Sequence, residues 1–146
     1  MQPILFPFFE RDLNKLIEEI SLYKNGEDIW NIREGINNSA GNLTLHIVGN
    51  LKHFIGATLG KTGYVRERDK EFSLKNIPRD QLVAEVKDTI HILKNTLSRL
   101  SEEDLEKDFP LPINHSVSST VTVLIYLLAH LNYHLGQVNY HRRLIG

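Results

Sequence analysis

The sequence has no cysteine and little proline, tryptophan or methionine. Among its 146 residues there are five prolines, one tryptophan and one methionine. The lack of cysteine excludes disulfides, thiolate zinc sites and a cysteine nucleophile. A nucleophile or a metal ligand must therefore come from another side chain or from a bound molecule.

The sequence also lacks an excess of charge of either sign. Its 17 basic and 18 acidic residues leave a formal net charge of -1. Without a basic surplus, binding to the phosphates of nucleic acid is disfavoured, and no polybasic run is available for anionic lipid. We expect neither nucleic acid nor a membrane as a partner.

Long hydrophobic runs are missing too. The longest strongly apolar segment, Val121 to Leu131, is shorter than the roughly 20 residues that span a bilayer. The start of the chain has no basic region before its short apolar run, and acidic residues follow at once, unlike a secretory signal. We expect a cytoplasmic protein.

Four segments carry the periodicity of helices, and we expect them to form a single domain over residues 1–146. The predicted helices run from about Leu5 to Tyr23, from Asn38 or Ser39 to about Leu59, from Asp80 to Leu100, and from about Ser118 to Leu144. Asn25-Gly26 predicts a left-handed stop after the first helix, and Trp30 is expected to anchor the loop that follows.

The fourth predicted helix begins with β-branched residues, which are also typical of a strand. Its apolar run continues far beyond strand length, which favours a helix. Residues 60–78 and the segment Ser101–Asn114 are predicted to be loops, and the charged part of the first, Arg66–Phe72, is expected to be solvated. The sequence therefore predicts an all-α four-helix bundle with long connections after its first three helices.

Three histidines occupy apolar helix faces. His130 and His134 stand four residues apart in the fourth helix, so they share one face and can bind the same metal ion. His46 lies on an apolar face of the second helix. Three imidazoles from two helices would leave coordination positions open, as catalytic metal sites do.

Spacing alone leaves two interpretations open. Buried histidines often bond to a carbonyl group or a water. Unpartnered rings, however, cost about 1–3 kcal/mol each, and one metal ion would satisfy all three.

The HExxH pattern of zinc proteases is absent, and a di-iron site would need two Glu-x-x-His pairs. His53 and His141 each lie seven residues from a candidate ligand, about 10 Å along a helix and too far for the same ion. His91 and His115 have the pattern of surface or loop residues.

Two segments resemble the DinB/YfiT-like superfamily. They are NNSAGNLTLHIVGNLKHF, residues 37–54, and AHLNYHLGQVNYHRR, residues 129–143, in which HxxxH is followed by x-Gly-Gln. RERDKEF, residues 66–72, is similar to a charged loop motif of an uncharacterised branch. The resemblance implies a four-helix bundle, often a homodimer, in which His46, His130 and His134 hold a divalent zinc, nickel, iron or manganese ion.

The spacing suggests roles for residues beside that ion. Asn50, one turn after His46, and Gln137, three residues after His134, would hold a water beside a ligand or orient a small-molecule substrate. Arg66 and Arg68, with Lys70, would bind a cosubstrate that carries a carboxylate. The alternatives are a local polar contact for the two amides and a solvated charged loop for the basic residues.

Three functions stay open. Relatives with an assigned activity are mostly thiol-dependent, so the resemblance implies a metal-dependent S-transferase acting on a low-molecular-weight thiol in detoxification or stress. A metal-dependent hydrolase is the second, although no carboxylate is clearly placed on the histidine face. The third is a non-catalytic, metal-stabilised dimeric bundle.

Overall fold

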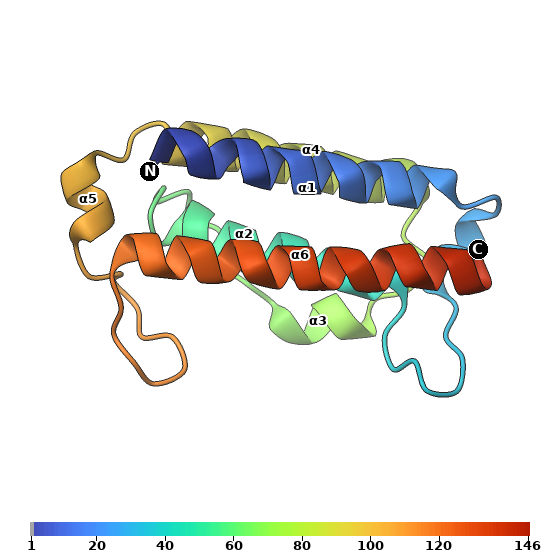
Figure 1. Ribbon diagram of the computed structural model, residues 1–146. Helices are drawn as coiled ribbons and strands as arrows, with labels where there is room; N and C mark the ends of the chain where they lie inside the picture. Colours follow the sequence, from blue (N-terminus) through green and yellow to red (C-terminus); the bar gives the residue numbers. More distant parts are fainter. Residues whose placement is uncertain (1) are drawn as a thin grey trace.

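The computed structural model describes residues 2–146, with side chains from residue 4 onward, and it is built from helices (Figure 1). The four main helices are α1 (Gln2–Leu22), α2 (Ala40–Leu51), α4 (Arg79–Leu97) and α6 (Thr120–Ile145). The shorter ones are η1 (Gly26–Trp30), η2 (Lys52–Ala57), α3 (Arg68–Ser73) and α5 (Glu102–Glu106). Within residues 2–146, the only extended pairing consists of two isolated β-bridges. The predicted all-α class is confirmed.

The four main helices pack around one apolar core. α1 lies against α4 and α6, and α2 lies against the same two helices (Figure 1). Leu13, Leu51, Leu93 and Leu127, one from each helix, are almost fully buried in it. This arrangement turns one face of α6 toward α2, which is where the site described below is formed. No helix within the described residues is long and apolar enough to cross a membrane.

Both helices that carry the candidate ligands begin where the sequence predicts. The Ser39 side chain accepts a hydrogen bond from the Asn42 backbone N–H and caps α2, and Ser119 caps α6 in the same way. The β-branched start of α6 is helical, because the helix continues its apolar packing from the first turn onward. Trp30 is buried against Gly41 of α2, so it anchors η1 as expected.

Three local predictions were wrong. Asn25 is extended, with a φ of -117°, and the chain enters η1 there without a left-handed stop. The segment Ser101–Asn114 contains α5, whose first turn is closed by a capping box of Ser101 and Asp104. The segment Arg66–Phe72 is not a solvated loop, because it contains most of α3 and buries Glu71. Helices this short bury too few residues to leave a periodic pattern in the sequence.

Candidate metal centre

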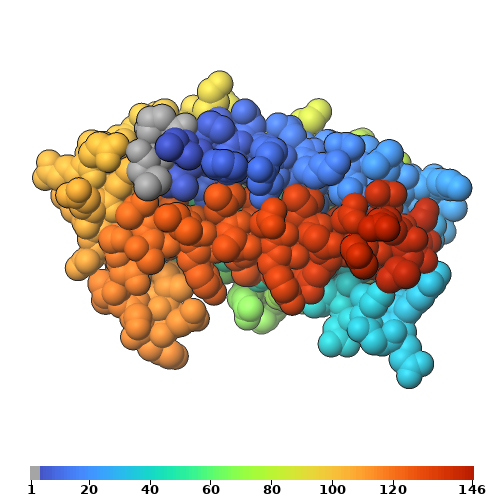
Figure 2. Space-filling view, viewed as in Figure 1, coloured from blue at the N-terminus to red at the C-terminus, as the bar shows by residue number. Residues whose placement is uncertain are grey.

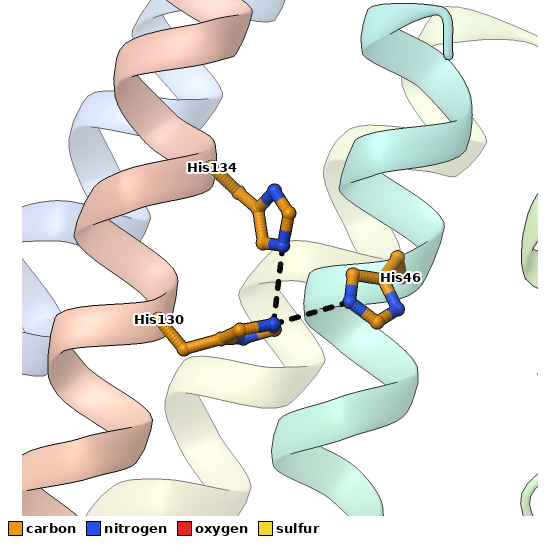
Figure 3. Close-up of side chains that lie close together, drawn as sticks. All are labelled: His46, His130 and His134. Carbon is orange, nitrogen blue, oxygen red and sulfur yellow. Dashed lines mark hydrogen bonds between the residues drawn. The ribbon is translucent and has the colours of Figure 1, made fainter. Parts of the chain in front are cut away.

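Three histidine rings converge between α2 and α6 (Figure 3). His46 projects from α2, while His130 and His134 project from successive turns of α6. His130 Nε2 lies 3.3 Å from His46 Nε2 and 3.1 Å from His134 Nε2. One ring nitrogen from each lies within 4.8 Å of the other two, and within the described chain these residues form the one such group that could hold a metal ion.

The outer nitrogens of two of these rings fix where their protons lie. His134 Nδ1 is 2.7 Å from Gln137 Oε1, and His46 Nδ1 is 3.0 Å from Glu71 Oε1. Both partner oxygens only accept hydrogen bonds, so each Nδ1 carries the proton. A neutral imidazole has a single N–H, and the Nε2 atoms of His46 and His134 therefore present lone pairs to the centre.

His130 cannot satisfy both of those lone pairs. Its Nε2 faces the two other Nε2 atoms, but a single N–H donates to only one of them. At least one lone pair in this part-buried group is left without a hydrogen-bond donor, and that costs free energy unless a cation accepts it. The donor set therefore fits a divalent metal ion. Imidazole nitrogen suits zinc, nickel and iron alike, and the set does not select among them.

The electrostatics keep the ligands in the form that binds metal. Burial lowers the pKa of His130 to about 4, with the neighbouring His134 and His46 adding to the effect. Burial also lowers the pKa of His134, and this outweighs the opposing hydrogen bond to Gln137. Neutral imidazole is the form that coordinates metals, so both rings are ready to bind at neutral pH.

A buried carboxylate supports His46 from its outer side. Glu71, in α3, is 6% exposed and also accepts hydrogen bonds from Arg66, at 2.8 Å from Nε and 2.9 Å from Nη2. Burial raises the pKa of Glu71, but the hydrogen bonds from His46 and Arg66 outweigh it and hold the pKa below its ordinary value. Arg66 Nη2 also lies 3.4 Å from His46 Nδ1, and because a guanidinium only donates, this contact would favour a lone pair on Nδ1. The shorter contact of 3.0 Å with the Glu71 carboxylate favours a proton there instead.

Two features of α2 hold Glu71 in place. The Asn42 side chain donates hydrogen bonds to the carbonyl oxygens of Glu71 and Leu74, which ties α3 onto α2. Gly49 leaves room for the carboxylate, because a Cβ there would lie 1.9 Å from Glu71 Oε2. Sequence reasoning missed Glu71. The signal that could have found it is Gly49, three residues after His46 and therefore on the same helix face.

A cavity of about 280 Å³ opens beside the histidines. It is lined by α2, η2 and α6, by Arg66 and Arg68, and by the loop of residues 112–114. Figure 2 shows the surface hollowed below α6, between that loop and α3. Asn50 lines the cavity too, and within the described residues its buried Oδ1 has no hydrogen-bond partner. Lys70, which the sequence grouped with the arginines, pairs with Glu67 at 2.8 Å.

The other histidines lie outside the group. His141 is buried, and its ring lies 2.6 Å from the Tyr23 hydroxyl through Nδ1 and 2.7 Å from the Asn31 carbonyl oxygen through Nε2. It joins α6 to the end of α1 and to η1, a structural role. His91 and His115 are exposed, as predicted, and His53 is half-buried in η2.

Fold and site together define an all-helical protein with a three-histidine group that could hold a metal ion. The chain belongs to the family described as "Protein of unknown function (DUF1572)", which matches residues 10–146. The match includes α2, α3 and α6, and so every residue of the site. No curated protein matches the chain.

Proposed function

We propose that this chain is a divalent-metal-dependent enzyme of the DinB/YfiT-like superfamily, folded as a four-helix bundle. His46, His130 and His134 would hold zinc, nickel, iron or manganese, and the adjacent cavity would receive a low-molecular-weight thiol for transfer to an electrophile. The observation that carries the proposal is the convergence of three Nε2 atoms, two of which are deprotonated by their outer hydrogen bonds.

The chemistry suits a chain without cysteine. When bound, a divalent ion lowers the pKa of a coordinated thiol from about 8.5, so that the thiolate forms at neutral pH. In the transfer, the thiol releases its proton to solvent and its sulfur forms a bond to a carbon of the electrophile. The bond between that carbon and the leaving group breaks, and the leaving group departs with the electron pair. Glu71 and Gln137 orient His46 and His134 through their Nδ1 atoms.

The lining of the cavity favours this reaction over hydrolysis. A hydrolase would use a general base beside the attacked bond, and a carboxylate is a usual choice. Of the described residues that line the cavity, none is Asp or Glu. Glu71 is turned to the outer side of His46 and is occupied by Arg66.

We also propose a cytoplasmic homodimer. The exposed side of α6 carries Tyr133, Tyr140 and Leu144, which are 66%, 63% and 58% exposed, and Figure 2 shows this helix lying open along one face. A row of large apolar side chains on one helix is typical of a surface that binds another protein. Sedimentation velocity of the wild type and of Tyr133→Lys tests the dimer, and a monomeric wild type would refute it.

Metal content tests the site directly. Tag-free wild type, His134→Ala and the exposed control His91→Ala are purified in parallel and analysed by inductively coupled plasma mass spectrometry. We expect about one metal ion per chain in the wild type and in the control, and a large loss in His134→Ala. Equal metal in all three proteins would refute the three-histidine site.

Activity separates the three functions. Thiol consumption with a chloronitrobenzene electrophile tests transfer, and release of nitrophenol from an ester without thiol tests hydrolysis. We expect transfer in the wild type and its loss in His46→Ala. Metal-dependent melting without turnover in either assay would instead indicate a metal-stabilised, non-catalytic bundle.

A further inference from the structure

The cavity beside the histidines is lined by Asn50, whose side-chain oxygen has no hydrogen-bond partner among the described residues. Asn50 is 8% exposed, and its Oδ1 is buried without a hydrogen-bond partner in the described part of the chain. Such an acceptor normally finds a partner, because leaving it unpaired costs free energy. The terminal torsion of Asn is broad, so the amide can turn to place its oxygen toward the cavity. A ligand with an N–H or O–H group would satisfy this oxygen.

The same cavity carries an excess of positive charge. Two guanidinium groups line it, but the nearby carboxylate of Glu71 is engaged by Arg66 and His46. Arg68 lies over the Phe72 ring at 5.7 Å, and in the described residues it forms no ion pair. Arginine binds carboxylates through two parallel hydrogen bonds. Arg68 is therefore available to a ligand, whereas two nitrogens of Arg66 are engaged by Glu71.

We propose that this cavity recognises a small organic carboxylate that also carries a hydrogen-bond donor. Arg68 binds the carboxylate, Asn50 Oδ1 accepts from the N–H or O–H, and the remaining end of the ligand lies toward His130. The volume of about 280 Å³ limits the ligand to a small molecule. The proposal deepens the proposed function and rests on it in one respect, namely that the end near His130 is a thiol.

Matched ligands separate the two recognition elements. N-acetylcysteine has a thiol, an amide N–H and a carboxylate. N-acetylcysteamine lacks the carboxylate, and 3-mercaptopropionate lacks the N–H. We expect calorimetric titration of the metal-loaded wild type to give N-acetylcysteine an affinity about tenfold or more above either analogue, the usual effect of losing one charge-assisted or buried hydrogen bond.

Variants assign each preference to its residue. Arg68→Gln should reduce the preference over N-acetylcysteamine to less than about twofold, and Asn50→Leu should do the same for the preference over 3-mercaptopropionate. Leucine has the same number and branching of side-chain heavy atoms as asparagine, and Asn50→Leu removes an unsatisfied group beside a cavity, so we expect the variant to fold. Arg143→Gln is the matched control, because Arg143 is also exposed and stacked on an aromatic ring, at 5.0 Å from Tyr140.

The oxygen analogues distinguish failure of this proposal from failure of the proposed function. N-acetylserine, N-acetylethanolamine and 3-hydroxypropionate repeat the comparison without sulfur. If selectivity persists in both series but sulfur gives no advantage, the carboxylate site stands and the thiol function falls. Equal affinities within each series, or variants that keep both preferences, would overturn the carboxylate site. Displacement of N-acetylcysteine by inorganic phosphate at lower concentration than by acetate would overturn the choice of a carboxylate.

Discussion

Replacing Gly49 with alanine would disturb the metal site without touching a ligand. A Cβ at this position would lie 1.9 Å from Glu71 Oε2 and 2.6 Å from its Cδ. Ordinary contact begins at about 3.4 Å, so the carboxylate must retreat by about 1.5 Å. The hydrogen bond between Glu71 and His46, 3.0 Å long, does not survive a displacement of this size.

Loss of that hydrogen bond sets the expected magnitude. A carboxylate that orients a metal-binding histidine contributes about 10-fold to 100-fold to metal affinity. We therefore expect Gly49→Ala to weaken zinc binding by this factor, equivalent to about 1.4–2.8 kcal/mol. Glu71→Gln should have an effect of the same order, because the neutral amide no longer attracts the Nδ1 proton as strongly.

The assay is competition for zinc against a chromophoric chelator, with circular dichroism to verify that each variant is folded. Gly136→Ala, in α6, is the matched control because its added Cβ meets nothing within 4 Å. It should leave zinc affinity unchanged and stabilise the helix by about 0.5–1 kcal/mol. The double variant Gly49→Ala/Glu71→Gln should lose no more affinity than the weaker-binding single variant, since both act through one contact.

Two results would refute this reasoning. The first is a folded Gly49→Ala protein that binds zinc within twofold of the wild type. The second is a double variant that loses as much zinc affinity as the two single variants together. Two changes that act only through the Glu71–His46 hydrogen bond cannot each remove its full contribution.

Three further predictions concern other contacts. Gln137→Leu removes the acceptor of His134 Nδ1, so zinc affinity in the same competition assay should fall about tenfold, and unchanged affinity would count against this role. Gly41→Ala places a Cβ 2.5 Å from the Trp30 ring, and urea unfolding should show a loss of about 1–3 kcal/mol with zinc affinity retained. Burial lowers the pKa of His141 despite its bond to the Asn31 carbonyl oxygen, so its contribution to stability is complete above the unfolded pKa near 6.5 and is lost at lower pH. In metal-free protein, the difference in unfolding free energy between wild type and His141→Leu should therefore become smaller from pH 7.5 to pH 5. A difference that stays constant would contradict this pH-dependent contribution of His141.

The sequence by itself determined the four main helices and half of the site. Periodic apolar residues and the caps at Ser39 and Ser119 are local features, so they predict closely where α2 and α6 begin, whereas α2 ends at Leu51 and the chain continues as η2. The four-residue spacing of His130 and His134 likewise places both rings on one face of α6, since helix geometry alone decides it.

Only the tertiary structure decided how the site is completed. His46 meets His130 from 84 residues away, and Glu71 reaches His46 from a short helix that has no periodic signal. The sequence left Asn50 either as a substrate contact or as a local polar contact, and packing alone leaves its oxygen unpaired among the described residues beside the cavity. Contacts between elements depend on how the helices stack, which the local pattern of each helix does not contain.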